Sequence, residues 1–155
     1  MWRCDRTNHG VVQGNSVMNV SSGGITAGSY YNSFSESPFG SSLTLRNNTV
    51  RHAGLGHRTA FGTQWGAGSG GIGLAGSSQR APNATTLHHN ITIVQNTITP
   101  LREQPALSAR ATSGLVLKLN KWCTWTKANE VSHCDDVENI GNYCCDQDCL
   151  DCRPC

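Results

Sequence analysis

The sequence predicts an all-β fold built from a repeated strand unit, because one eight-residue pattern returns four times along 155 residues. The pattern reads apolar–x–apolar–x–x–Asn–x–apolar, and its alternation of apolar and polar positions has the period of a β-strand. Two further observations agree. The chain holds 17 Gly and only 14% charged residues. No stretch keeps a helical apolar period over three turns, so we expect few helices.

The Asn of each copy sits where the alternation breaks, so we expect it at a bend between two strands. Asn tolerates left-handed backbone angles and bonds to nearby backbone groups. Units of this kind bury their apolar side by stacking on one another, which would place the Asn amides in a ladder inside the coil. The four copies are Gly10–Val17, Leu43–Val50, Ile91–Ile98 and Leu115–Trp122, and their ladder residues are Asn15, Asn48, Asn96 and Asn120.

A second, weaker motif follows each of the first three copies. Its members are Gly23–Ala27, Gly70–Ala75 and Pro105–Ala109. Each predicts another short strand, and the alternation leaves small residues on the outer face of that strand.

The order of strand, bend Asn, strand, loop and Gly-Ile strand resembles the right-handed parallel β-helix proteins of the pectin-lyase-like superfamily, over residues 8–122. The resemblance implies coils of three short strands, with the Asn ladder between the second and third strands. It also implies that the Gly-Ile strand opens the next coil, so that the repeats would make about three coils. An ordinary β-sandwich is the alternative fold that the residues leave open.

Charge and cysteine content divide the chain at about residue 122. Residues 1–122 hold ten Lys/Arg against three acids, a net charge of +7, whereas residues 123–155 hold two against seven, a net charge of −5. Seven of the eight Cys lie in residues 123–155. We therefore expect a β-helix domain over 1–122 and an irregular, disulfide-rich tail over 123–155.

The tail also contains a spacing that raises the possibility of a metal site. The four Cys from Cys145 to Cys155 are separated by gaps of three, two and two residues. An iron–sulfur run of this type has its three-residue gap last and a Pro after the final Cys, which this order does not match. We therefore prefer disulfides to zinc or iron–sulfur, and predict no metal and no cofactor.

Four N-glycosylation sequons accompany the Cys-rich tail, at Asn19, Asn47, Asn83 and Asn90. Together they predict a secreted or extracellular protein. Residues 1–5 lack the apolar core of a signal peptide, and an uncapped top coil would expose unpaired strand edges. We therefore expect a C-terminal fragment of a longer secreted protein. No apolar run is long enough to span a membrane, and no nucleic-acid motif is found.

Two long loops, residues 28–39 and 51–66, would rise on opposite sides of the Gly-Ile strands. We expect them to wall a groove whose floor is formed by the small outer residues Thr26, Gly73 and Ser108. Aromatic faces suit the C–H faces of sugar rings. The substrate-binding candidates are Trp65, Tyr30, Tyr31 and Phe61. The alternative is that these aromatic side chains pack down on the coil and contact no ligand.

Catalytic chemistry is harder to assemble from this composition. A glycoside hydrolase uses two carboxylates, and Glu36 is the one acid in a groove loop. A lyase needs a base and a cationic group, for which His57 and Arg58 are candidates. His88 and His89 are adjacent on a strand and would point to opposite faces, so they do not predict a shared metal ion.

Two functions remain open. The first is binding or processing of a polysaccharide or glycan, by a lyase or glycoside hydrolase of the parallel β-helix type if the protein is an enzyme. Catalytic candidates are then Glu36, His57 and Arg58. The second is a non-catalytic structural or cell-surface module with a cystine-rich cap. The sequence does not fix the oligomeric state.

Overall fold

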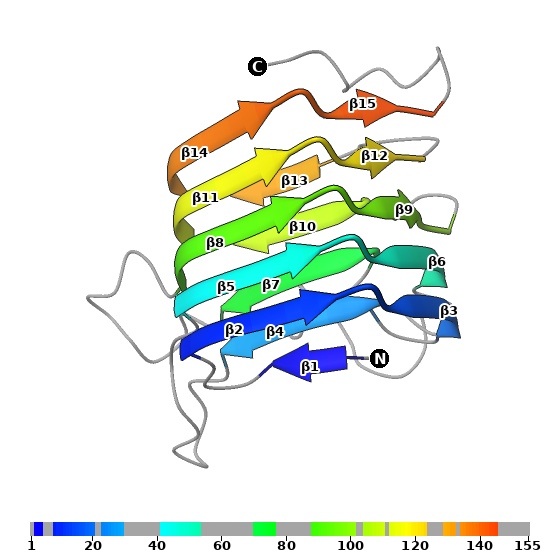
Figure 1. Ribbon diagram of the computed structural model, residues 1–155, viewed down its shortest axis with the longest axis horizontal. Coiled ribbons are helices and arrows are strands. Elements are labelled where there is room, and N and C mark those ends of the chain that lie inside the picture. The colour runs from blue at the N-terminus through cyan, green and yellow to red at the C-terminus, as the bar shows by residue number, and fades with distance from the viewer. Residues whose placement is uncertain are drawn as a thin grey trace.

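A computed structural model describes residues 2–4, 8–20, 23–29, 41–53, 70–76, 88–101, 104–110, 112–123, 129–132 and 134–145. Within these ranges all regular secondary structure is β-strand, and every strand pair is parallel. The strands form three sheets of five strands each. In Figure 1 the strands of each sheet lie side by side, from blue at one end of the stack to orange at the other. The all-β prediction is therefore confirmed for the described residues.

The three sheets take their strands from regular intervals along the chain. Sheet A contains β1 (Trp2–Cys4), β4 (Ile25–Ser29), β7 (Ile72–Gly76), β10 (Leu107–Arg110) and β13 (Asn129–Ser132). Sheet B contains β2 (Asn8–Gln13), β5 (Ser41–Arg46), β8 (His88–Val94), β11 (Thr112–Lys118) and β14 (Asp135–Ile140). Sheet C contains β3 (Ser16–Val20), β6 (Thr49–Ala53), β9 (Thr97–Thr99), β12 (Lys121–Trp122) and β15 (Tyr143–Cys144).

The chain visits sheets B, C and A in turn, and we call each such passage a rung. The first rung is β2, β3 and β4, the second begins at β5, the third at β8 and the fourth at β11. The last rung is β14 and β15. The expected region of the repeats, residues 8–122, contains three complete rungs and the first two strands of a fourth, and the other strands come from residues 2–4 and 129–144.

The core lies between the three sheets and follows the alternation of each strand. In sheet B the paired positions Leu43, Ile91 and Leu115 are at most 1% exposed, and so are the positions two residues further along each strand. Sheets A and C complete the core from their inner faces. Their fully buried large side chains are Ile25, Ile72, Leu74, Ile98, Leu107 and Trp122.

The bend between sheets B and C is made by the residue before each ladder Asn. These residues have left-handed backbone angles in all five rungs, whereas the ladder Asn residues do not. They are Gly14, Asn47, Gln95, Leu119 and Gly141. The left-handed angle at the bend therefore belongs to the residue before the Asn. With the preceding residue making the turn, the Asn directs both its backbone N–H and its side chain at the neighbouring rung.

Residues 129–144 correct the expectation of an irregular tail. They form β13, β14 and β15, which extend sheets A, B and C. Residues 137–144 are in register with the fourth copy of the repeat, with Asn139 opposite Leu117 and Cys144 opposite Trp122. This fifth copy escapes the sequence pattern because Asn139 and Cys144 occupy positions that are apolar in the other copies.

Candidate functional site

A ladder of hydrogen-bonded asparagine side chains runs through the stack. The amide Nδ2 of Asn15 donates to Oδ1 of Asn48 at 3.0 Å. Asn48 repeats this contact with Asn96 at 3.0 Å, and Asn96 with Asn120 at 3.0 Å. Asn120 then donates to Oδ1 of Asn142 at 2.8 Å. The four Asn residues of the repeat therefore lie in one column, and Asn142 is a fifth member that the sequence pattern did not include.

Each ladder amide also binds the backbone of the adjacent rungs. The backbone N–H of Asn48 donates to the same Asn96 Oδ1 at 3.0 Å, so that oxygen accepts two hydrogen bonds. Nδ2 of Asn96 donates to the carbonyl of Leu45 at 2.9 Å. Asn48, Asn96 and Asn120 are at most 1% exposed. Buried polar groups without partners are costly. The ladder gives hydrogen-bond partners to the buried amide groups at the bend of each interior rung.

The ladder ends at Asn142 in a different way. Nδ2 of Asn142 bonds to Oδ1 of Asn139, which lies in the same rung. In the interior rungs the corresponding donor reaches the next Asn of the ladder. Asn139 thus takes the position of a further rung. A Gly–Asn pair, Gly14–Asn15 at one end and Gly141–Asn142 at the other, was the sequence signal for this fifth member.

The outer face of sheet A was predicted to be the floor of a groove. Thr26, Gly73 and Ser108 do align in one column by the strand register. All three are buried, and Thr26 and Ser108 are only 2% and 6% exposed. Oγ1 of Thr26 is buried without a hydrogen-bond partner. The floor is therefore a covered row of small residues with one unpaired hydroxyl.

The same register extends the column to charged residues at both ends. Arg3 pairs with Thr26, and Glu130 pairs with Ser108. Sequence reasoning did not include Glu130, because it assigned that residue to an irregular tail. Residues 129–132 contain a single apolar residue, Val131, so they carry no alternation that could have placed this strand in sheet A.

The predicted catalytic and aromatic residues fall outside the described ranges. These are Glu36, His57, Arg58, Trp65, Tyr30, Tyr31 and Phe61. The groove walls therefore stay a prediction, and only the floor is described.

Three of the four predicted glycosylation sites are described, and Asn83 lies outside the described ranges. Asn19, Asn47 and Asn90 are all exposed and have left-handed backbone angles. Oδ1 of Asn19 lies 3.2 Å from Nδ1 of His52 on the neighbouring rung. These three side chains therefore lie on the outside of the stack, Asn47 at a bend and Asn19 and Asn90 within strands β3 and β8.

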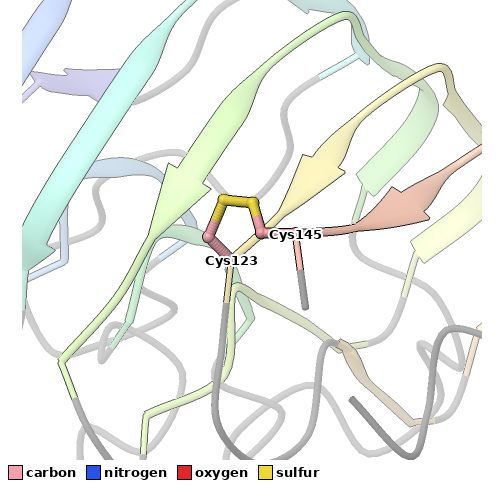
Figure 2. The surroundings of a disulfide bond; sticks show 2 residues. All are labelled: Cys123 and Cys145. Carbon is pink, nitrogen blue, oxygen red and sulfur yellow. A yellow bond between two sulfur atoms is a disulfide. The ribbon is translucent and has the colours of Figure 1, made fainter. Parts of the chain in front are cut away.

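A disulfide joins the last two rungs just beyond the strands of sheet C. Cys123 follows β12, Cys145 follows β15, and Figure 2 shows their sulfur atoms bonded. Their Cα atoms are 4.8 Å apart, and the backbone N–H of Cys145 donates to the carbonyl of Trp122 at 3.0 Å. Cys144 is also disulfide-bonded. Disulfides persist in oxidising compartments, so this bond is consistent with an extracellular location.

The described residues contain no group of three or more His, Cys, Asp and Glu side chains that could hold a metal ion. His88 is buried and its neighbour His89 is exposed, so the two lie on opposite faces of β8.

Comparisons with models of protein families, with curated proteins and with solved structures found no match. No helix in the described ranges has the length and apolar character needed to cross a membrane.

Proposed function

We propose that this chain forms a secreted, right-handed parallel β-helix that binds or processes a polysaccharide or glycan. The support for the β-helix is the order in which the chain visits three parallel sheets. Handedness follows from the general preference of parallel crossover connections for a right-handed path. The expected family resemblance to pectin-lyase-like proteins is part of this proposal.

The observation that carries the glycan part is the row of small polar residues on sheet A. Thr26 is buried, yet its hydroxyl has no partner, and buried polar groups in folded proteins usually have one. A sugar hydroxyl would supply that partner. Aromatic side chains from residues 30–31 and 61–65 would stack on the sugar rings.

An array of acidic and neutral polysaccharides tests this proposal with three variants. Thr26→Val keeps the shape of the side chain and removes the hydroxyl, so we expect a loss of about 1 kcal/mol in binding. Trp65→Ala should cost about 1–2 kcal/mol. Thr44→Val, at an outward position of sheet B, is the control and should bind as the wild type does. Equal binding by all four proteins would exclude this site.

Catalysis is tested separately on any polysaccharide that binds. If the chain processes its ligand, Glu36→Gln should abolish the release of new sugar ends, because Glu36 is the proposed acid in the groove loops. His57→Ala and Arg58→Ala should do so for a lyase, whose reaction needs a base and a cation. Unchanged turnover in all three variants would remove these residues from the mechanism.

A non-catalytic structural or surface module is the second candidate. It is favoured by the burial of the floor, since Thr26 and Ser108 are only 2% and 6% exposed. It predicts no glycan binding by any variant. It also predicts that Thr26→Val raises the free energy of unfolding, because an unpaired buried hydroxyl is replaced by a methyl group.

A further inference from the structure

Among the described strands, those at the two ends of the stack are paired on one side only. We call the edges of β1, β2 and β3 the N-terminal face, and the edges of β13, β14 and β15 the C-terminal face. Within the described part of the chain, each of these six strands pairs with a neighbour on one side only. Unpaired edges are templates for pairing with another chain.

The ladder leaves complementary groups at the two faces. In the interior, the backbone N–H of each ladder Asn donates to Oδ1 of the next, as Asn96 does to Asn120 at 3.0 Å. Among the described residues, Oδ1 of Asn15 accepts no hydrogen bond and the backbone N–H of Asn142 donates none. One face therefore offers an acceptor and the other a donor in the same column.

The two faces also differ in charge. The described residues of the first two rungs contain Arg46 and Arg51 and no acid. Residues 129–145 contain no Lys or Arg and include four acids, Glu130, Asp135, Asp136 and Glu138. Opposite charge at opposite ends favours contact between unlike faces and disfavours contact between like faces.

The C-terminal face retains apolar surface. Val137 is 42% exposed and Val131 is 39% exposed, although they are in register with the buried residues Leu115 and Ala109. A further rung would bury both side chains. By contrast, Val12 and Val17 at the other end of the stack are 8% and 6% exposed.

We propose that the C-terminal face of one molecule binds the N-terminal face of a second copy of this chain. Continuing the observed register sets β2 of the second copy beside β14. Oδ1 of its Asn15 then accepts from the backbone N–H of Asn142. Since the contact joins two different faces, it does not close, and it produces linear chains of molecules.

The register identifies a test pair on the outer surface. One residue from each strand of sheet B forms a column along the outer surface. In order, these residues are Val11, Thr44, Thr92, Val116 and Glu138. Val11 of the second copy therefore lies opposite Glu138 of the first. Val11 is 61% exposed and Glu138 is exposed, so substitutions at either position leave the core and the ladder intact.

Sedimentation velocity of the full chain over a range of concentrations measures this contact. We expect the average mass to rise with concentration beyond a dimer and to fall as salt is added. Val11→Glu should weaken the association about two- to fivefold, because like charges would lie directly opposite across the new strand pair. Glu138→Lys should restore it when combined with Val11→Glu. Thr92→Glu, in the same outer column but two rungs from each end, is the control and should associate as the wild type does.

Three results would overturn the proposal. The first is a protein that stays monomeric at every concentration. The second is association that stops at a dimer, because a closed dimer would indicate contact between like faces rather than between the two different faces. The third is a double variant that associates no better than Val11→Glu alone, which would place the contact elsewhere on the molecule.

Discussion

The third rung and the last rung have the same arrangement of strands but different burial. In β8 the inward residues Ile91 and Ile93 are fully buried. At the corresponding positions of β14, Val137 is 42% exposed and Asn139 is also exposed. Among the described strands, β8 has a partner on both sides and β14 on one. The inward residues of the third rung are therefore covered by a rung on each side, and those of β14 by one, which is the arrangement in which stacked repeats stabilise each other.

The largest effect should come from removing an interior member of the ladder. Asn96→Leu deletes an oxygen that accepts from Asn48 and an amide that donates to Leu45 and Asn120. At least three buried groups lose a partner, so we expect the free energy of unfolding to fall by about 3 kcal/mol or more. Denaturant unfolding measures this change.

The same substitution in the last rung provides matched controls. Asn142→Leu should cost about 1 kcal/mol, because Asn142 is only half-buried and has one neighbouring rung. Asn139→Leu should change stability by less than about 0.5 kcal/mol, since the side chain is exposed. Equal losses at 96 and 142 would mean that the two rungs do not differ as described.

The next effect concerns the disulfide between the fourth and last rungs. Cys123 and Cys145 are separated by 22 residues. Replacing both with Ala should lower stability by about 3 kcal/mol through the entropy of the unfolded chain. Mass spectrometry without reduction first establishes that the native bond is present. A double variant with unchanged thermal unfolding would show that the rungs hold without this bond.

Substitutions at two glycines compare the cost of an added Cβ in the interior of the stack with its cost in the first rung. A Cβ on Gly71 would lie 2.5 Å from the carbonyl oxygen of Ala106 and would also meet Ile98. Gly71→Ala should therefore cost about 1–3 kcal/mol from overpacking. Gly14 has a φ of +68°, and no atom lies within 4 Å of the position that a Cβ would occupy, so Gly14→Ala should cost about 1 kcal/mol from the backbone alone. Thermal unfolding of the two variants tests this order.

The smallest effect on stability should come from the exposed sequons. Asn47 lies in the same bend column as Gln95, so Gln fits its backbone angle. In a secretory host, Asn47→Gln should remove one glycan and change stability by less than about 0.5 kcal/mol. Masses before and after enzymatic deglycosylation report the glycan. An unchanged mass for both wild type and variant would show that Asn47 is not modified.

The sequence predicted the strands well where the alternation of apolar and polar residues and the eight-residue pattern are both intact. Leu43, Leu45, Ile91 and Ile93 alternate with polar residues, and burial follows that alternation. The last rung escaped because Asn139 stands at an inward position where the other rungs have apolar residues. That exception has a physical reason. The inward positions of β14 are exposed, so a polar residue is tolerated there, and its oxygen accepts a hydrogen bond from Asn142.

The site was less accessible to sequence reasoning. Alternation could place Thr26 and Ser108 on the outer face of sheet A, but it could not show that this face is covered. Burial of an outer face depends on what packs over it, which is a tertiary property that a local period does not contain. The aromatic and catalytic candidates in the two loops stay predictions for the same reason.

Hydrogen exchange at the ladder backbone amides tests most directly whether neighbours on both sides stabilise a rung. The N–H of Asn96 donates to Asn120 at 3.0 Å inside the stack, whereas the N–H of Asn142 donates no hydrogen bond among the described residues. At a concentration where the protein is monomeric, we predict that the Asn96 amide exchanges at least about a hundredfold more slowly than that of Asn142. Comparable exchange rates at the two amides would contradict the account.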